Sequence, residues 1–557
     1  MSAAESRDLG ELLADQIRAT ISQALQSGQL SGALPESIPL ERPKNRAHGD
    51  YSSSIALQLA KPSGMSPRDV ALLLKVELEK LEVLSSVEIA GPGFLNFTLN
   101  RASQAELVQR IISMGSRYGR GDSLHGRAIN LEFISANPTG PLHLGHTRWA
   151  AVGDALGRVL SAAGAQVTRE FYINDRGNQM NLFGASVEAS ALGAAIPEDG
   201  YQGEYIHDLA KTVVATNPDI INLSAPDRHI EFREAAYALQ LQQQQSVLER
   251  FHTTFDVWFS ERSLHDSGAV EHGVDKLREG GHVYDSEGAT WLRTTDFGDD
   301  KDRVLIKADG ELTYFASDTA YYINKRERGF DICIYMLGAD HHGYVNRLRA
   351  TAACAGDNPD FTIEVLIGQL VKIMEGGEEV KLSKRAGTII TLEELVDKVG
   401  VDAARYTLIR YPVDTPMVMD LDILRKNTNE NPVYYVQYAH ARIAGVLRNV
   451  NELGISMTSF DASALTHDKE NELLGVLAEY PRVVASAAEL REPHRIARYL
   501  EELATAFHAF YSECRVVPLG EEPATAVHSA RAQLCAAARQ VLANGLDLLG
   551  VSAPERM

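Results

Sequence analysis

The spacing of hydrophobic residues changes along the chain, and these changes divide it into three parts. Near the start, apolar residues recur at every fourth position, which predicts an amphipathic helix over residues 9–25. These positions are Leu9, Leu13, Ile17, Ile21 and Leu25. A second helical pattern follows Pro67, and a strand-like run extends from Val87 to Leu99. We therefore expect a small α+β domain over residues 1–115.

From about residue 125, short apolar runs alternate with helical patterns, which favours a parallel sheet covered by helices. The predicted strands are Ile129–Ile134, Val167–Tyr172, Ile332–Leu337 and Val365–Ile373. An insertion rich in acidic residues, Gln and Ala lies between the second and third strands, at about 180–295. Its stretch Glu231–Phe259 has a helical pattern. The segment from Arg303 to Ser317 predicts a hairpin that turns at Asp309 and Gly310.

Strand patterns almost disappear after Gly400. The remaining residues follow a helical period, which predicts an all-α C-terminal domain over residues 401–557. The sheet therefore belongs to residues 116–400. A chain of 557 residues is too long for one hydrophobic core, in agreement with several domains. It has neither a long uncharged apolar run nor a secretory signal pattern, so we expect a cytoplasmic protein that does not contact membranes.

The net charge of the chain argues against nonspecific binding of nucleic acid but does not exclude specific binding of RNA. A net charge of −21 argues against indiscriminate binding of nucleic acid, because phosphate contacts need Lys and Arg. Residues 1–120 hold 13 Lys+Arg against 13 Asp+Glu, so the excess negative charge lies in the rest of the chain. An acidic protein with neutral or locally basic surfaces can still bind RNA by shape.

The cysteines predict no metal site. Cys333, Cys354, Cys514 and Cys535 form no C-x-x-C pair and stand in apolar segments. We expect buried free thiols, with no structural zinc and no disulfide framework.

A strand, a Gly/Pro turn and a helix follow one another between Ile129 and Gly164, and the turn carries two histidines. His143 and His146 stand at the predicted helix N-terminus, where unpaired N–H groups already favour phosphate. Gly140 and Pro141 turn the backbone, and Gly145 allows a ligand to approach closely. This order is typical of nucleotide sites and indicates a triphosphate held for attack at its α-phosphorus. The alternative is a merely polar helix start.

A second candidate segment lies far downstream. Lys381, Lys384 and Arg385 place three cations in five residues, around Ser383 and next to a glycine. Such a loop suits a triphosphate. By itself, a Lys-rich loop is more often a solvated turn.

Together, the two motifs resemble the paired signatures of class I aminoacyl-tRNA synthetases, and further segments resemble the arginyl-tRNA synthetase family. These segments are HGDY, AGPGFLNF, SANPTGPLHLGH, YFASDTAYYINK, GADHHGY, NPVYYVQYAHARI and APERM. The resemblance covers nearly the full length. It implies a Rossmann-type α/β catalytic domain, an N-terminal domain that contacts the tRNA elbow, and a helical domain that reads the anticodon.

The resemblance also implies a reaction. L-Arginine would attack ATP to give arginyl-adenylate and pyrophosphate, and the arginyl group would then pass to tRNA with release of AMP. Mg²⁺ would accompany the ATP phosphates. Catalysis would consist of positioning and charge stabilisation rather than covalent chemistry. We expect a monomer whose activation of arginine requires tRNA.

The resemblance implies a role for each of several residues. His143, His146, Lys381 and Lys384 would be catalytic. The ATP site would add Thr139, Gly140, Pro141, Leu142, Gly145 and Ser383. The arginine site would comprise Glu132, Asn137, His146, Tyr314, Asp318 and His342, since a buried guanidinium needs carboxylate partners. Contacts to tRNA would come from Phe94, Asn96, Tyr438, Arg442 and Met557.

Several alternatives stay open at the sequence level. Glu132 could be an edge residue facing water, Asp318 a helix N-cap, and Phe94 a core residue. His341 could replace His342. A cysteinyl-type synthetase would need a Cys/His zinc cluster, which the sequence does not offer. A small nucleotidylyltransferase would lack the flanking domains, and a non-catalytic tRNA-binding relative would be expected to lose a signature residue.

Overall fold

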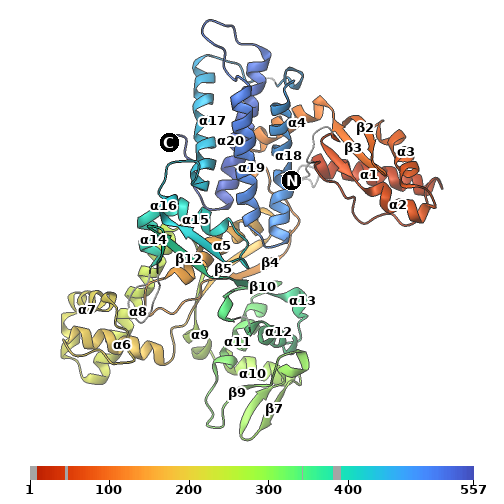
Figure 1. The fold of residues 1–557 in the computed structure, drawn as a ribbon. Coiled ribbons are helices and arrows are strands. Elements are labelled where there is room, and N and C mark those ends of the chain that lie inside the picture. Colours follow the sequence, from red (N-terminus) through yellow and green to blue (C-terminus); the bar gives the residue numbers. More distant parts are fainter. Residues whose placement is uncertain (1–8, 44–47, 342, 381–389, 459) are drawn as a thin grey trace.

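The chain folds into a central parallel sheet with a helical bundle on one side and two smaller units on the other (Figure 1). The computed structural model describes residues 9–43, 48–341, 343–380, 390–458 and 460–557. The N-terminal domain projects to one side of the bundle. The sheet therefore lies between the helical bundle and the two smaller units.

The N-terminal domain packs helices against a three-stranded antiparallel sheet of order β1-β3-β2. The predicted first helix is confirmed, and its apolar stripe is buried. The run predicted as one strand forms two, because Gly91 and Gly93 turn the chain with φ of 52° and 142°. The elements are α1 (Leu9–Gln26), β1 (Tyr51–Ser53), α2 (Ile55–Ser63), α3 (Pro67–Leu78), β2 (Leu84–Ala90), β3 (Phe94–Leu99) and α4 (Arg101–Met114).

The central sheet has the order β11-β10-β4-β5-β6, and all of its strand pairs are parallel. Its strands are β4 (Ala128–Glu132), β5 (Gln166–Ile173), β6 (Val257–Ser260), β10 (Ile332–Gly338) and β11 (Ile363–Gly368). Helix α5 (Leu144–Ala162) packs closely on β4. A Cβ on Gly153 would lie 2.4 Å from the ring of Phe133, so only glycine permits this approach. Strand order reverses beside β4, where doubly wound sheets bind ligands.

Three predicted elements have other boundaries or another form. Strand β4 ends at Glu132, because Ile134 and Ser135 adopt left-handed backbone conformations with φ of 72° and 44°. The run predicted as one strand at 365–373 is divided between two strands in different sheets. It contains the last residues of β11 and the first residues of β12 (Val371–Glu375). The predicted helix at 231–259 is α8 (Ala225–Arg250), followed by β6. Parallel pairing with β5 draws the last residues of that run into the sheet.

The stretch expected as one insertion at 180–295 is divided by β6. Before it, α6 (Asn178–Ala191), α7 (Glu204–Thr216) and α8 share an apolar core of their own. After it come α9 (Glu261–Asp266), α10 (Ala269–Glu279) and a small sheet of β7 (Val283–Ser286), β8 (Ala289–Leu292) and β9 (Arg303–Ile306). The predicted hairpin turns as expected, but its second arm makes only an isolated bridge between Ile306 and Leu312. Helix α11 (Tyr314–Glu327) then begins, followed by α12 (Tyr344–Cys354) and α13 (Pro359–Thr362).

The C-terminal part is helical from Pro432 onward, as predicted. It includes α17 (Pro432–Glu452), α18 (Asp468–Glu489), α19 (His494–Glu513) and α20 (Ala526–Leu548). The expectation of helices alone from residue 401 is corrected by β14 (Met417–Asp420), which pairs in parallel with β12 and makes a small sheet with β13 (Glu378–Glu379). The connecting helices are α14 (Leu392–Val399), α15 (Val401–Ile409) and α16 (Leu421–Leu424).

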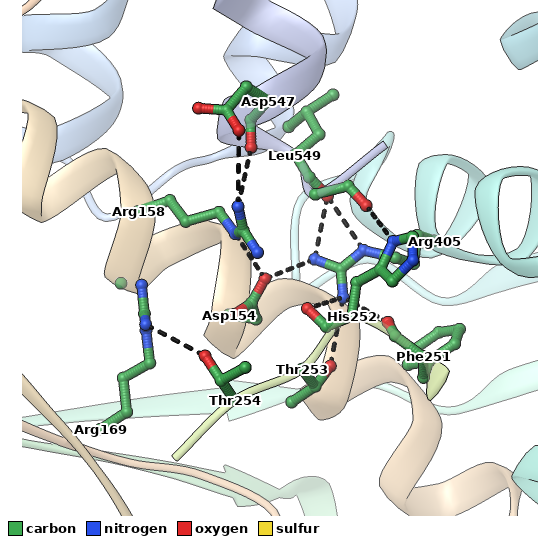
Figure 2. Close-up of polar contacts among 12 residues, drawn as sticks. Asp154, Arg158, Arg169, Phe251, His252, Thr253, Thr254, Arg405, Asp547 and Leu549 are labelled. Atoms are coloured by element: carbon green, nitrogen blue, oxygen red, sulfur yellow. Dashed lines mark hydrogen bonds and ion pairs between the residues drawn. The ribbon is translucent and has the colours of Figure 1, made fainter. Parts of the chain in front are cut away.

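A buried arginine joins three parts of the chain (Figure 2). Arg405 of α15 donates to Asp154 of α5 at 2.6 Å, to the carbonyl of Leu549 at 2.9 Å and to the carbonyl of Phe251 at 2.8 Å. Asp154 is fully buried as well. Helix α5, the end of α8 and the C-terminal segment are thereby tied to one side chain.

The four cysteines are buried free thiols, as predicted. Within the described residues, none of the helices has the length and apolar character that a membrane span requires.

Candidate active site

A cavity of about 920 Å³ opens at the carboxyl ends of β4 and β10. Its volume lies within the range of small-molecule sites. Its wall includes predicted site residues from three distant segments, namely Glu132, His143, Gly145, His146 and Asp318. The fold therefore brings the first histidine motif and both predicted carboxylates to one space.

The side chains of the two histidines cap the N-terminus of α5 and pack against each other. His143 is the N-cap, and its Nδ1 accepts the N–H of Gly145 at 3.1 Å. His146 Nδ1 accepts the N–H of His143 at 3.3 Å, and the two rings lie 4.0 Å apart. This mutual capping holds both imidazoles at the positive end of the helix dipole, where negative charge is favoured.

The second motif lies outside the described residues, and so do its predicted site residues Lys381, Ser383 and Lys384. The first described residue after it, Ile390, accepts a hydrogen bond from Leu144 N–H at 3.1 Å, and Leu392 N–H donates to the carbonyl of Leu142 at 2.8 Å. The segment after the lysines is therefore fixed against the histidine turn.

The Gly/Pro turn lies behind the cavity rather than in its wall. Tyr205 of α7 donates to the carbonyl of Thr139 at 2.9 Å, and Gln244 of α8 donates to the carbonyl of Gly140 at 2.8 Å. Thr139 and Leu142 are buried, and Pro141 is exposed. Of the described residues predicted for ATP, those of the turn support the site, and His143, Gly145 and His146 line it.

Glu132 is an inward-facing carboxylate. Strand β4 lies between β10 and β5, and Glu132 is 8% exposed, so the edge interpretation is wrong. Its Oε1 accepts from Ser135 Oγ at 2.9 Å, and its Oε2 lies 2.6 Å from Lys325 Nζ. The carboxylate is held at both oxygens beside the cavity.

Asp318 lies one turn into α11 and is not its cap. Thr313 occupies the N-cap and accepts from Ala316 N–H at 3.2 Å. Asp318 instead faces the cavity, where the Tyr344 hydroxyl donates to it. Burial raises the pKa of Asp318 to about 6; the bond from Tyr344 opposes this rise, and the charge of Glu132 adds to it. A cationic partner would favour the ionised form.

The remaining residues predicted for arginine are placed less directly. Tyr314 is 74% exposed at the start of α11, and it does not appear in the cavity wall. The Asn137 amide bonds to Gln179. His342 lies outside the described residues, whereas its neighbour His341 lines the cavity.

Three site residues were not found from the sequence. Lys325 and Tyr344 hold the two carboxylates. Arg148 lines the cavity and donates to the carbonyls of Gln369, Thr415 and Pro412 at 2.9, 3.0 and 2.7 Å; burial lowers its pKa to about 10. Only Lys325 carried a sequence signal, since Asp318, Tyr321 and Lys325 share one helix face by spacing.

The residues predicted to contact tRNA lie in the two outer domains. Phe94 is 38% exposed, so it is not a core residue, whereas Asn96 is buried and accepts from Ser52 Oγ at 2.8 Å. On α17, Arg442 lies over the rings of Tyr438 and Tyr511. Met557 is 55% exposed.

Family models match almost the whole chain. The arginyl tRNA synthetase N-terminal domain matches residues 13–99, the class I (R) tRNA synthetase catalytic domain matches 107–439, and the DALR anticodon binding domain matches 436–557. The chain belongs to the arginyl-tRNA synthetase family. It is therefore a class I aminoacyl-tRNA synthetase, as the paired motifs predicted.

Relatives in this family are similar over their full length. The arginine–tRNA ligase of Paenarthrobacter aurescens is 54% identical over 550 residues, covering 98% of this chain and 100% of the relative. That of Micrococcus luteus is 52% identical over 560 residues, covering 99% of each. The fold is similar to that of Thermus thermophilus arginyl-tRNA synthetase, with a TM-score of 0.75, 21% identity, and 98% and 100% of the two chains covered.

Proposed function

We propose that the cavity beside β4 is where this arginine–tRNA ligase forms arginyl-adenylate from L-arginine and ATP, before the arginyl group passes to tRNA. One observation carries the proposal: the paired histidines and the two carboxylates open into the same space. The first suits an anion and the second suits a guanidinium, and the reaction joins molecules that carry these groups.

On the ATP side, the N-terminus of α5 would hold the phosphates. Gly145 allows close approach, and His143 and His146 would stabilise the charge that develops on the α-phosphoryl group and pyrophosphate. Lys381, Ser383 and Lys384 would complete the site from the following loop. In the described part of the chain, no group of three His, Cys, Asp or Glu residues could hold a metal ion. Mg²⁺ would therefore enter as part of the ATP substrate.

On the arginine side, Glu132 and Asp318 would bind the guanidinium from two directions. A planar guanidinium has five N–H donors, so two carboxylates can bind it without competing for the same hydrogens. His146 would lie between the two substrates, and Asn137, Tyr314 and His342 would complete the site. Positioning alone could then bring the carboxylate of arginine to the α-phosphorus.

We assign the outer domains to tRNA. The exposed ring of Phe94 can stack on an unpaired base, and Tyr438 with Arg442 offers a stacking surface on α17. Asn96 would hold the strand that carries Phe94 from its buried position, and Met557 would contact RNA at the chain end. A monomer in the cytoplasm stays our prediction, and sedimentation and cell fractionation would test it.

A charging assay tests the function. The protein is incubated with ATP, total tRNA and each of the twenty amino acids in turn, and only arginine is expected to be attached. His143→Ala should reduce charging strongly, whereas His207→Ala, on the exposed face of α7, should not. Attachment of another amino acid, or an unaffected His143→Ala protein, would refute the assignment.

A further inference from the structure

A row of three side chains crosses the sheet beneath the cavity. Tyr335 of β10, Glu132 of β4 and Glu170 of β5 are register partners on adjacent strands. Partners in a parallel sheet point to the same face. Helix α11 covers this row with Tyr321 and Lys325, both within two turns of Asp318.

Lys325 is buried behind the cavity wall. Its ammonium lies 2.6 Å from Glu132 Oε2, and 4.3 and 3.9 Å from the ring centroids of Tyr321 and Tyr335. A buried ammonium needs a counter-charge, and aromatic faces add a smaller attraction. Glu132, Tyr321 and Tyr335 all line the cavity, whereas Lys325 contacts it only through them.

The charges in this row form two pairs. Glu170 accepts two hydrogen bonds from the Arg328 guanidinium, at 2.5 and 2.9 Å. Glu170 therefore has its own cation, and Lys325 is the direct partner of Glu132. Asp318 is bonded to the neutral Tyr344 hydroxyl, and the charge of Arg347 acts on it without an ion pair between them. The predicted arginine pocket therefore carries one carboxylate with a direct cationic partner and one whose direct partner is neutral.

The two bonds to Glu132 also fix its orientation. Ser135 holds Oε1 and Lys325 holds Oε2. Ser135 can reach back because its backbone is in the left-handed region, with φ of 44°. A carboxylate offers about four acceptor positions, so these bonds can set its plane and still leave positions for a ligand's N–H groups.

We propose that Lys325 is a positioning residue for arginine binding: it holds Glu132 oriented toward the guanidinium, and it balances the charge of Glu132 so that Asp318 meets the charge of the ligand. The inference rests on the proposed function of the cavity. Without Lys325, two carboxylates would face one cation, and a proton shared between them would compete with the substrate. The pocket would then bind arginine weakly and in a pH-dependent way.

Lys325→Met tests this role in the full chain through tRNA charging. The KM for arginine should rise about 30-fold or more, while the KM for ATP and kcat at saturating arginine change less than about threefold. The acid limb of kcat/KM for arginine should move to higher pH. Lys325→Arg, which keeps a cation, should restore much of the affinity. The titratable and charged groups that face this pair are Asp318, Glu170, Arg328, Tyr172, Tyr321, Tyr335 and Cys333.

Lys276→Met is the matched control. Lys276 of α10 forms an ion pair at 2.9 Å with Glu327, which lies on α11 like Lys325, but both side chains are about 40% exposed. Its removal should leave the KM for arginine and the pH profile unchanged. If Lys325→Met and Lys276→Met gave the same kinetics, the proposal would be overturned.

A double-mutant cycle separates this inference from the assignment of the pocket. Glu132→Gln should raise the KM for arginine, and adding Lys325→Met should raise it no further, because Lys325 acts through Glu132. The double variant loses both charges and is expected to fold even where Lys325→Met does not. A further rise in KM in the double variant would overturn the role of Lys325 alone. An unchanged KM in Glu132→Gln would instead overturn the arginine pocket.

Discussion

Asp318 is the side chain whose chemistry most directly links the structure to the choice of substrate. It stands in the cavity wall, bonds to a neutral hydroxyl and has no capping role in its helix. A cation that enters the cavity would give this carboxylate a direct charged partner in addition to the more distant charge of Arg347. Two predictions follow from its position and its pKa.

Asp318→Asn should raise the KM for arginine strongly and change the KM for ATP little. Loss of one partner of a desolvated guanidinium pair costs about 3–5 kcal/mol, which is at least about a hundredfold in KM. Steady-state charging kinetics measure both constants. Thr313→Ala is the control, since loss of the true N-cap should cost about 1 kcal/mol of stability and leave arginine binding intact. Unchanged arginine kinetics in Asp318→Asn would contradict the pocket.

The raised pKa of Asp318 predicts how arginine binding depends on pH. Burial raises this pKa to about 6, so below that pH the free protein carries a neutral acid where the guanidinium needs a carboxylate. Arginine must then displace a proton, and its KM should rise about tenfold for each unit below pH 6. Above pH 6 the KM should be level. Kinetics between pH 5 and 8 measure this limb, and Asp318→Asn should lack it.

At the scale of elements, helix α5 connects the site to the rest of the molecule. Its first turn carries the paired histidines, and its middle carries Asp154, the partner of Arg405 (Figure 2). Arg405 also holds the carbonyls at the end of α8 and at Leu549. The position of α5 therefore depends on contacts with distant parts of the chain, at Phe251, Arg405 and Leu549.

Arg405→Met should destabilise the fold by about 3–5 kcal/mol, because it leaves Asp154 with only the partly exposed Arg158 as its partner and leaves several buried carbonyls without a donor. Urea unfolding measures the loss. Arg250→Met removes an ion pair of the same 2.6 Å length with Asp397, but both side chains are about half exposed. That control should cost less than about 1 kcal/mol. Equal losses in the two variants would show that burial of the pair has no special effect.

At the scale of the whole molecule, the segment that follows the lysine loop leads from the site to the helical bundle. It is bonded to the histidine turn through Ile390 and Leu392, continues through α14 and α15, and reaches Arg405. We infer that binding of RNA at the bundle acts on the histidine turn through this segment, by a population shift. A difference in binding of about 3 kcal/mol between two arrangements would change activity roughly a hundredfold.

We expect arginine-dependent exchange of pyrophosphate with ATP to be nearly silent until cognate tRNA is added. Isotope exchange with and without purified tRNA measures this dependence, and a noncognate tRNA is the control. Equal exchange rates in all three conditions would mean that the site assembles without RNA. The coupling would then be wrong, although the family assignment would stand.

Local patterns in the sequence were sufficient to predict the structural features that depend on neighbouring residues. The four-residue period of residues 9–25 predicted α1, because a helix face is a local property. The strand, turn and helix around His143 and His146 predicted the anion site for the same reason, and the paired motifs led to the family. The carboxylates Glu132 and Asp318 came from the resemblance, and the structure places both in the cavity wall.

The pairing of the strands and the partners of the buried charges are visible only in the tertiary structure. An apolar run such as 365–373 does not specify its partners, and here it is divided between a strand beside β10 and a strand beside β14. Likewise, the local pattern predicts that residues 257–259 continue a helix, but their pairing with β5 makes them part of the strand β6. Lysine is a residue type that is usually exposed to solvent. Lys325 is nevertheless buried against Glu132, which precedes it by 193 residues. Partners so far apart in the sequence are selected by the free energy of the assembled core, which no local pattern contains.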